Sequence, residues 1–317
     1  MTNTLHFPKD LTTADSKSLA RIISVIENES SGYEEILHSV KPDVKIPVVG
    51  ITGAPGAGKS SLINALLKEL TLNEKKYLKG KGIAVLAVDP TSSFSHGALL
   101  GDRLRMSEHF NHPKVFIRSL ATRGSLGGLS AKTMELTDIL RAAGFDYIFI
   151  ETVGVGQSEV EIASLAETTV VVFVPESGDE VQTIKSGIME IADIFVVNKS
   201  DREGADKIVR NIKSSLHLRG HSYPIATGWE IPVIKTIASQ SEGVTQLLKK
   251  INEHNLLPGK QKNKQLLFEK ALRLIRDYKM KEIDKTVLKN KLEEAQMKND
   301  FNLYEFVKRF TTLNFKL

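Results

Sequence analysis

The chain has 317 residues, 41% hydrophobic and 26% charged, enough for one large α/β domain with appendages or for two smaller domains. It contains no cysteine, which excludes disulfides, thiolate zinc sites and cysteine-ligated iron–sulfur clusters. The net charge of +5 lies in the tail, since residues 259–317 carry 15 basic and 8 acidic side chains and the rest carries 28 and 30. We therefore expect no nucleic-acid partner.

Residues 1–44 are predicted to form an N-terminal helical arm. Leu19, Ile22, Ile23 and Ile26 recur at helical spacing, and a second helical pattern follows the Ser-Ser-Gly at 30–32. The first residues show no basic stretch followed by an apolar core, which argues against a secretory signal. The apolar stripe could fold back onto its own domain or pack on a second subunit, and the sequence leaves both open.

Seven short runs rich in β-branched residues follow, and most are nearly continuously apolar, as strands buried on both faces should be. They span 46–52, 82–89, 114–120, 145–152, 169–176, 194–201 and 231–238. Helical patterns at 61–70, 130–143, 159–166 and 179–192 lie between several of them. This alternation predicts an α/β domain over residues 45–257, with a mostly parallel sheet flanked by helices. No apolar run exceeds strand length, so we expect no membrane span. A chain without cysteine suits the reducing cytosol, so we expect a cytoplasmic protein.

The composition changes at Pro258. Residues 258–317 are rich in Lys and Glu and periodic, which predicts a C-terminal helical arm rather than more sheet. Such arms pack either on a second subunit or on their own domain.

A glycine-rich segment, GAPGAGKS, follows the first strand and precedes an amphipathic helix, which is the P-loop arrangement. Backbone N–H groups of the turn and the positive end of the helix cradle phosphates, Lys59 reaches the β/γ oxygens, and the Ser60 hydroxyl can ligate Mg²⁺. The predicted nucleotide-binding residues here are Gly53, Ala54, Pro55, Gly56, Ala57, Gly58, Lys59, Ser60 and Ser61.

The base is predicted from Asn198-Lys199-Ser200-Asp201 at the end of a late strand. Asp201 can accept both N1–H and N2–H of guanine, which adenine cannot offer. The stem of Lys199 can lie over the base plane, and the backbone near Ala238 could supply a second base contact. The sequence therefore predicts GTP/GDP as the ligand.

Carboxylates at other strand ends predict the metal side of the site. Glu151 ends the fourth run and can hold Mg²⁺ directly or through water, while Gly154 can bring its N–H to a γ-phosphate. Asp89 and Asp102 could complete the Mg²⁺ ligands. Gln157 is the candidate for positioning water, but its spacing from Gly154 is unusual, so hydrolysis is expected to be slow and partner-stimulated.

Longer stretches resemble one family: LAVDPTSSFSHGALLGDRLRM, VFIRSLATRGSLGGLS, ETVGVGQSEVEIA and PESGDEVQTIKSGIMEIADIFVVNKSD are similar to MeaB/ArgK-type GTPases. These belong to the SIMIBI class of P-loop NTPases and are related to the human methylmalonic aciduria type A protein. The resemblance covers roughly residues 17 to 255. It implies a homodimeric G-protein chaperone that gates cofactor loading of an adenosylcobalamin-dependent acyl-CoA mutase, most often methylmalonyl-CoA mutase, and protects or reactivates it.

Site residues carried over by motif are Lys59, Ser60, Asp89, Asp102 and Glu151. The resemblance also implies a switch loop over 176–190, with Asp179, Gln182 and Lys185, that relays nucleotide state to the mutase. Lys59, Asp102, Glu151 and Lys185 form the expected catalytic set. Glu176 stands where the family usually has glycine.

Two other functions are weighed against this one. A kinase for an amino-acid transport component would share the P-loop, but no second-substrate site is recognisable. A metal-delivery GTPase would need Cys or His ligands; the pair His109 and His112 is interpreted as structural.

Four arginines and the tryptophan can each be interpreted as functional or as structural residues. One of Arg103, Arg105, Arg118 and Arg123 could act as an arginine finger, although ion pairing or mutase docking is favoured. Trp229, the single tryptophan, is interpreted as a packed residue.

Overall fold

A computed structural model describes residues 16–43, 45–79, 82–89, 106–121, 131–152, 154, 161–176, 188–219, 228–257, 261–297 and 301–314. Within these ranges nothing is described of the side chains of residues 89, 121, 131, 219, 261–266, 273, 277, 313 and 314.

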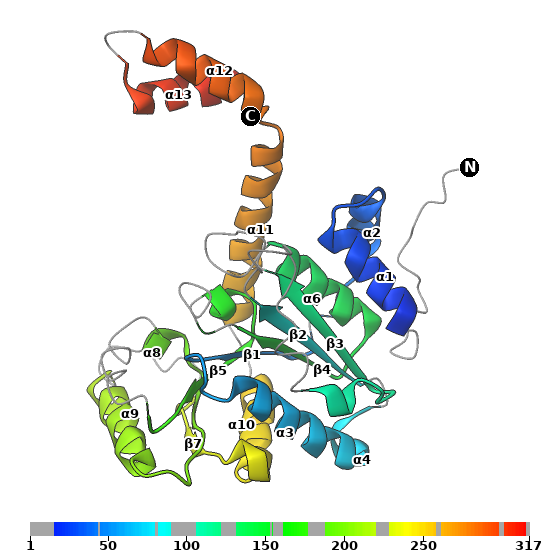
Figure 1. Cartoon of the computed structure of the whole chain (residues 1–317), viewed down its shortest axis with the longest axis vertical. Helices are drawn as coiled ribbons and strands as arrows, with labels where there is room; N and C mark the ends of the chain where they lie inside the picture. The colour runs from blue at the N-terminus through cyan, green and yellow to red at the C-terminus, as the bar shows by residue number, and fades with distance from the viewer. Residues whose placement is uncertain are drawn as a thin grey trace. The chain divides into compact units, whose positions relative to one another are not determined.

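Seven parallel strands form one sheet in the order β3-β2-β4-β1-β5-β6-β7 (Figure 1). Their bounds are β1 Val48–Thr52, β2 Ile83–Asp89, β3 Val115–Ala121, β4 Tyr147–Glu151, β5 Thr168–Phe173, β6 Ile194–Val197 and β7 Val233–Lys235. Every predicted run overlaps one of these strands, with β3 and β5 each extending one residue beyond its run, so the predicted α/β fold is confirmed. The continuous apolar character of β1, β4, β5 and β6 follows from their burial at every position.

Helices cover both faces of the sheet, because parallel neighbours require crossover connections. The bounds are α3 Lys59–Leu72, α4 Glu74–Tyr77, η1 Ser107–His109, α6 Ala131–Ala143, η2 Ile162–Ser164, α8 Ile188–Ile191, α9 Ala205–Arg219, η5 Ala238–Gln240 and α10 Val244–Asn255. The patterns at 61–70 and 130–143 correspond to α3 and α6. The described part of the pattern at 159–166 holds the short 3₁₀ helix η2, and only α8 of the pattern at 179–192 is described.

Alternate residues of each strand enter different cores, as the two-residue period of a strand requires. Val49 and Ile51 of β1 pack with α3 and α10 on one face, whereas Val48 packs with α6 on the other. A third cluster joins Val171 of β5 to α8 and α9. Figure 1 shows the same division of helices between the two faces.

The N-terminal arm forms α1, Ser16–Glu27, and α2, Tyr33–Ser39. All four residues of the predicted stripe are buried, in the cluster that contains α6 and the β4 residue Ile148. Arg118 of β3 donates to Glu27 at 2.6 Å, which ties α1 to the sheet edge. The stripe therefore packs on its own domain.

The C-terminal residues form a separate compact unit over Lys264–Leu317, six residues beyond the predicted start of the arm at 258. It contains most of α11, Gln261–Lys281, together with α12 Lys285–Gln296 and α13 Leu303–Asn314. The rings of Phe306 and Phe310 stack at 6.0 Å, and Lys291 Nζ lies 5.7 Å from the centroid of the Phe310 ring. Among its described residues, Phe310 is the one buried hydrophobic side chain.

Candidate functional site

Three neighbouring strands end at the same edge of the sheet, and the described phosphate and metal residues of the prediction lie at their ends or shortly after them. Ile51 of β1 is level with Glu151 of β4, which is level with Ala87 of β2. Because the strands are parallel, the loop after β1, the end of β4 and Asp89 at the end of β2 gather at the carboxyl edge, where open α/β sheets bind ligands.

The P-loop occupies the turn between β1 and α3. Gly58 has φ +85°, and a Cβ there would overlap the side-chain nitrogen of Asn198, so only glycine fits. Helix α3 begins at Lys59, directly after this left-handed residue. The N–H groups of its first turn therefore point at the space above the loop.

Lys59 lies across the loop, and Gly154 lies beside it. The Lys59 ammonium donates to the carbonyl of Gly53 at 2.8 Å and to that of Ala54 at 3.0 Å. Gly154 has φ +81°, and a Cβ there would lie 2.6 Å from Lys59 Nζ and overlap the Gly53 carbonyl. The structure thus brings together the two groups predicted to contact the γ-phosphate.

Ser60 and Glu151 form a buried pair between α3 and β4. The Ser60 hydroxyl donates to the Glu151 carboxylate at 2.6 Å. A hydroxyl and a carboxylate are oxygen ligands of the kind that Mg²⁺ prefers, so these two residues fit that ion. Asp89 ends β2 on the same edge, but its side chain is among those not described. Asp102 lies outside the described residues.

Asn198 connects the P-loop to the base-side loops. Its amide donates to the Ala57 carbonyl at 3.0 Å, and its carbonyl accepts from the Thr236 hydroxyl and the Ala238 N–H, each at 3.1 Å. The Ala238 N–H, predicted as a base contact, already has Asn198 as its acceptor, so a base would have to share it. Sequence reasoning missed Thr236, whose partner lies 38 residues away.

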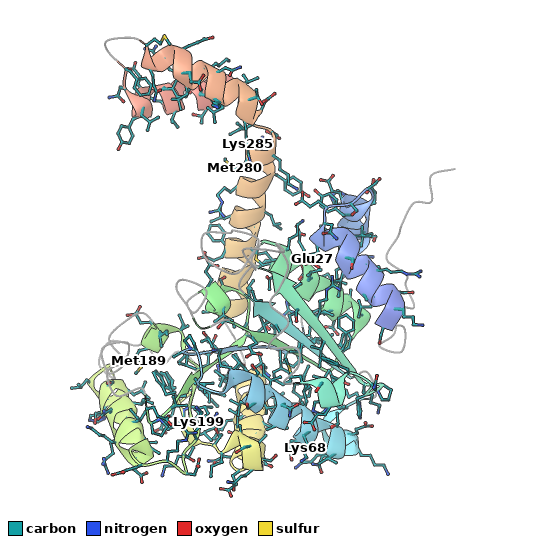
Figure 2. The ribbon with its side chains drawn as sticks, in the orientation of Figure 1. Glu27, Lys68, Met189, Lys199, Met280 and Lys285 are labelled. Atoms are coloured by element: carbon teal, nitrogen blue, oxygen red, sulfur yellow. The ribbon has the colours of Figure 1, made fainter. Side chains whose placement is uncertain are left out.

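The remaining base-side residues follow β6 in a tight turn. Lys199 (Figure 2) has φ +54° and is half-buried, and its backbone carbonyl accepts the Arg202 N–H at 3.0 Å. Asp201 is exposed. The turn thus leaves the Asp201 carboxylate exposed beside a half-buried lysine, and their contact with guanine stays a prediction.

Several predicted residues lie outside the described ranges: Arg103, Arg105, Arg123, Gln157, Asp179, Gln182 and Lys185. Arg118 is described, and its guanidinium donates to Glu27 and, at 3.2 Å, to Ser24, which agrees with the ion-pairing interpretation.

The histidine pair and the tryptophan have structural surroundings. His109 is buried, and burial lowers its pKa, while His112 accepts the Lys114 N–H at 3.3 Å. The described residues contain no group of three or more potential metal-ligating side chains. Trp229 packs against the core and donates to the Asp193 carbonyl at 2.9 Å. No helix in the described part of the chain is long and apolar enough to cross a membrane.

A P-loop at the carboxyl edge of a parallel sheet, with a strand-end glutamate and an Asn-Lys-Ser-Asp base loop, defines a P-loop GTPase. The comparisons with known proteins support this class. A family model described as methylmalonyl-CoA mutase-associated GTPase MeaB matches residues 19–293. The chain belongs to this family, and the match extends past residue 255 into α12.

Individual relatives agree with the family assignment. A candidate GTPase of Pyrococcus horikoshii is 49% identical over 245 residues, which are 77% of this chain and 75% of that protein. A fused isobutyryl-CoA mutase of Geobacillus kaustophilus is 38% identical over 239 residues, 73% of this chain and 22% of that protein. The crystal structure of a LAO/AO transport system kinase has a TM-score of 0.62 at 24% identity, covering 96% and 90% of the two chains, and supports the fold alone.

Proposed function

We propose that this GTPase is a chaperone of an adenosylcobalamin-dependent acyl-CoA mutase, with methylmalonyl-CoA mutase as the first candidate. In this role it gates loading of the cofactor and protects or reactivates the mutase. The observation that carries the proposal is the relative in which a homologous region is part of a fused isobutyryl-CoA mutase. Fusion holds two partners at high effective concentration, which is useful where they act on each other.

Such a role requires two conformational states of the protein, one with GTP and one with GDP bound at the P-loop. A ligand shifts a conformational equilibrium only through contacts that differ between the states. GTP and GDP differ at the γ-phosphate, and Lys59 and Gly154 lie side by side where that phosphate is expected. The state would pass to the mutase through residues 176–190, including Asp179, Gln182 and Lys185.

Mg²⁺ would be held by Ser60 and Glu151, with Asp89 and Asp102 as the other expected ligands. The ion neutralises charge on the β- and γ-phosphates when bound. Lys59 contributes a second positive charge, and the first N–H groups of α3 orient the phosphate oxygens. Slow, partner-stimulated turnover stays part of the proposal, because Gln157, the candidate for positioning water, stands at an unusual spacing from Gly154.

The C-terminal unit is proposed to dimerise the protein, with a second copy of the chain as the occupant of its apolar surface. Its exposed large hydrophobic side chains repeat along the helices: Leu267, Phe268, Leu272, Ile275, Tyr278, Met280, Val287, Leu303, Tyr304 and Val307. A cytoplasmic location stays part of the proposal.

GTP turnover tests the proposal, measured for the full chain alone and with purified methylmalonyl- or isobutyryl-CoA mutase. Lys59→Ala removes the phosphate contact. Lys68→Ala is the matched control, because Lys68 is exposed on the same helix about 13 Å further along (Figure 2). We expect one mutase to accelerate hydrolysis by the wild type and by Lys68→Ala but not by Lys59→Ala.

Three results would count against this reading. GTP turnover that ignores both mutases would retain the GTPase and remove the mutase partner. Acceleration that persists in Lys59→Ala would place hydrolysis outside this P-loop. Phosphoryl transfer from ATP to a small acceptor, with no GTP turnover, would favour the kinase.

A further inference from the structure

Two buried threonines join the strand before the P-loop to the strand end that carries Glu151. The Thr152 hydroxyl donates to the Thr52 hydroxyl at 2.9 Å, and the Thr152 N–H donates to the Ile51 carbonyl at 3.2 Å. Thr52 is 0% and Thr152 2% exposed. Neither residue belongs to the predicted nucleotide contacts.

The pair lies on the face of the sheet opposite α3. Thr52 follows Gly50 by two residues on β1, and a Cβ on Gly50 would be 2.5 Å from Ile162 in the α6-side core. Two-residue alternation therefore directs Thr52 to that face. Glu151 bonds Ser60 of α3 on the other face. The end of β4 is thus held from both sides.

The pair also lies close in sequence to the two segments that flank the expected γ-phosphate position, the P-loop and Gly154. Thr52 is followed directly by Gly53, whose carbonyl accepts from Lys59 at 2.8 Å. Thr152 precedes Gly154 by two residues, and Gly154 lies against that same carbonyl. Displacing Thr152 relative to Thr52 would therefore change the separation between Gly154 and the P-loop.

We infer that the Thr52–Thr152 hydrogen bond is a positioning device that sets Gly154 for discrimination between GTP and GDP. The inference rests on the proposed contact of Gly154 with the γ-phosphate. A directional bond specifies a position in a way that apolar packing does not. Two valines would fill nearly the same volume, with no polar group to satisfy.

Two variants of Thr152 distinguish the effect of its hydroxyl group from the effect of its side-chain shape. Thr152→Val keeps the branched shape and removes the donor, whereas Thr152→Ser keeps the donor and removes a methyl group. We expect Thr152→Val to reduce the affinity for a non-hydrolysable GTP analogue about threefold to tenfold relative to GDP, the range that one hydrogen bond supplies. Thr152→Ser should retain the wild-type ratio, and kcat should fall with the ratio in Thr152→Val.

The double variant Thr52→Val/Thr152→Val distinguishes positioning from stability. Removing both partners leaves no unsatisfied hydroxyl, so the melting temperature followed by Trp229 fluorescence should return toward the wild-type value. The nucleotide ratio should stay reduced. If the threonine pair served stability alone, the double variant would regain the wild-type melting temperature and the wild-type nucleotide ratio together.

Gly154→Ala separates failure of this inference from failure of the proposed site. If Gly154→Ala lowers the GTP/GDP ratio and Thr152→Val leaves it unchanged, the threonine pair has no positioning role. If Gly154→Ala also leaves the ratio unchanged, Gly154 is not the γ-phosphate contact and the inference fails with it. A Thr152→Ser variant that behaves like Thr152→Val would assign the effect to packing.

Discussion

The GTPase domain and the C-terminal unit differ in how much of their apolar surface they bury. In the domain, strands such as β4 are buried at every position, and the N-terminal stripe is covered by α6 and the sheet. In the C-terminal unit, Leu272 is 49% and Ile275 59% exposed. The domain buries its apolar side chains within one chain, whereas the C-terminal unit leaves several of its own exposed, and the partner proposed for that surface is a second copy of the chain.

This difference explains where the chemistry lies. Ser60, Glu151 and Asn198 are polar groups that stay ordered because a rigid core surrounds them and each has a bonded partner. Among the described residues of the C-terminal unit, Phe310 is the one buried hydrophobic side chain, and the role proposed for this unit is association.

The largest effect should come from removing a core side chain. Phe149→Ala on β4, where the residue is 0% exposed, should cost about 3–5 kcal/mol of unfolding free energy. Ile275→Ala should change the stability of the domain by less than about 0.5 kcal/mol. Denaturant titration followed by Trp229 fluorescence measures this, because the single tryptophan lies in the domain. Equal losses in both variants would mean that the two regions unfold as one.

A change in the metal pair should leave the core intact and weaken the chemistry. Glu151→Gln keeps the size of the side chain but removes its charge, so the Mg²⁺ concentration for half-maximal GTP turnover should rise about 10- to 100-fold. Glu27→Gln is the control, since its carboxylate pairs with Arg118 away from the P-loop. An unchanged Mg²⁺ dependence would remove Glu151 from the metal site.

A charge in the apolar surface of α11 should act on association alone. Leu272→Glu is expected to raise the dimer dissociation constant at least about tenfold, because it buries a carboxylate in the proposed interface. Lys281→Glu, at an exposed polar position of the same helix, should keep the dimer. Sedimentation equilibrium gives the masses. A wild-type chain that is monomeric at micromolar concentration would contradict the proposed interface.

The smallest effect should be local to the C-terminal unit. The Asp284 carboxylate caps α12 by accepting from Thr286 N–H at 2.8 Å and Val287 N–H at 3.1 Å. Asp284→Ala should cost about 1 kcal/mol, and Asp284→Asn much less. Hydrogen exchange at these two amides should quicken in the alanine variant while Trp229 fluorescence stays unchanged. Equal exchange in the two variants would show that the cap contributes little.

Much of the fold could be predicted because its signals are local. Buried parallel strands appear as continuous apolar runs, and the P-loop is contiguous in sequence between a strand and a helix. Glu151 and Asn198 could be placed at strand ends because parallel strands end at a common edge. The helical pattern at 159–166 corresponds, in its described part, to the 3₁₀ helix η2, because a short amphipathic pattern does not distinguish the two kinds of helix.

The contacts that the sequence did not reveal are long-range. Thr236 and Asn198 meet only after β6 and β7 pair, and Thr52 meets Thr152 across 100 residues. The docking of α1 on α6 likewise depends on which strands become neighbours. An apolar stripe fixes which face of a helix is buried but does not identify what buries it.

The docking of α1 also has a consequence for biosynthesis. Helix α1 ends at Glu27, but α6 and β4, which cover its stripe, begin at Ala131 and Tyr147. At about 5–20 residues per second, a ribosome needs on the order of ten seconds to make the intervening chain. During that interval Leu19, Ile22, Ile23 and Ile26 have not met their final neighbours. The apolar stripe of α1 therefore stays without its final cover until β4 has been made, whereas α6 and β4 meet α1 as soon as they leave the ribosome.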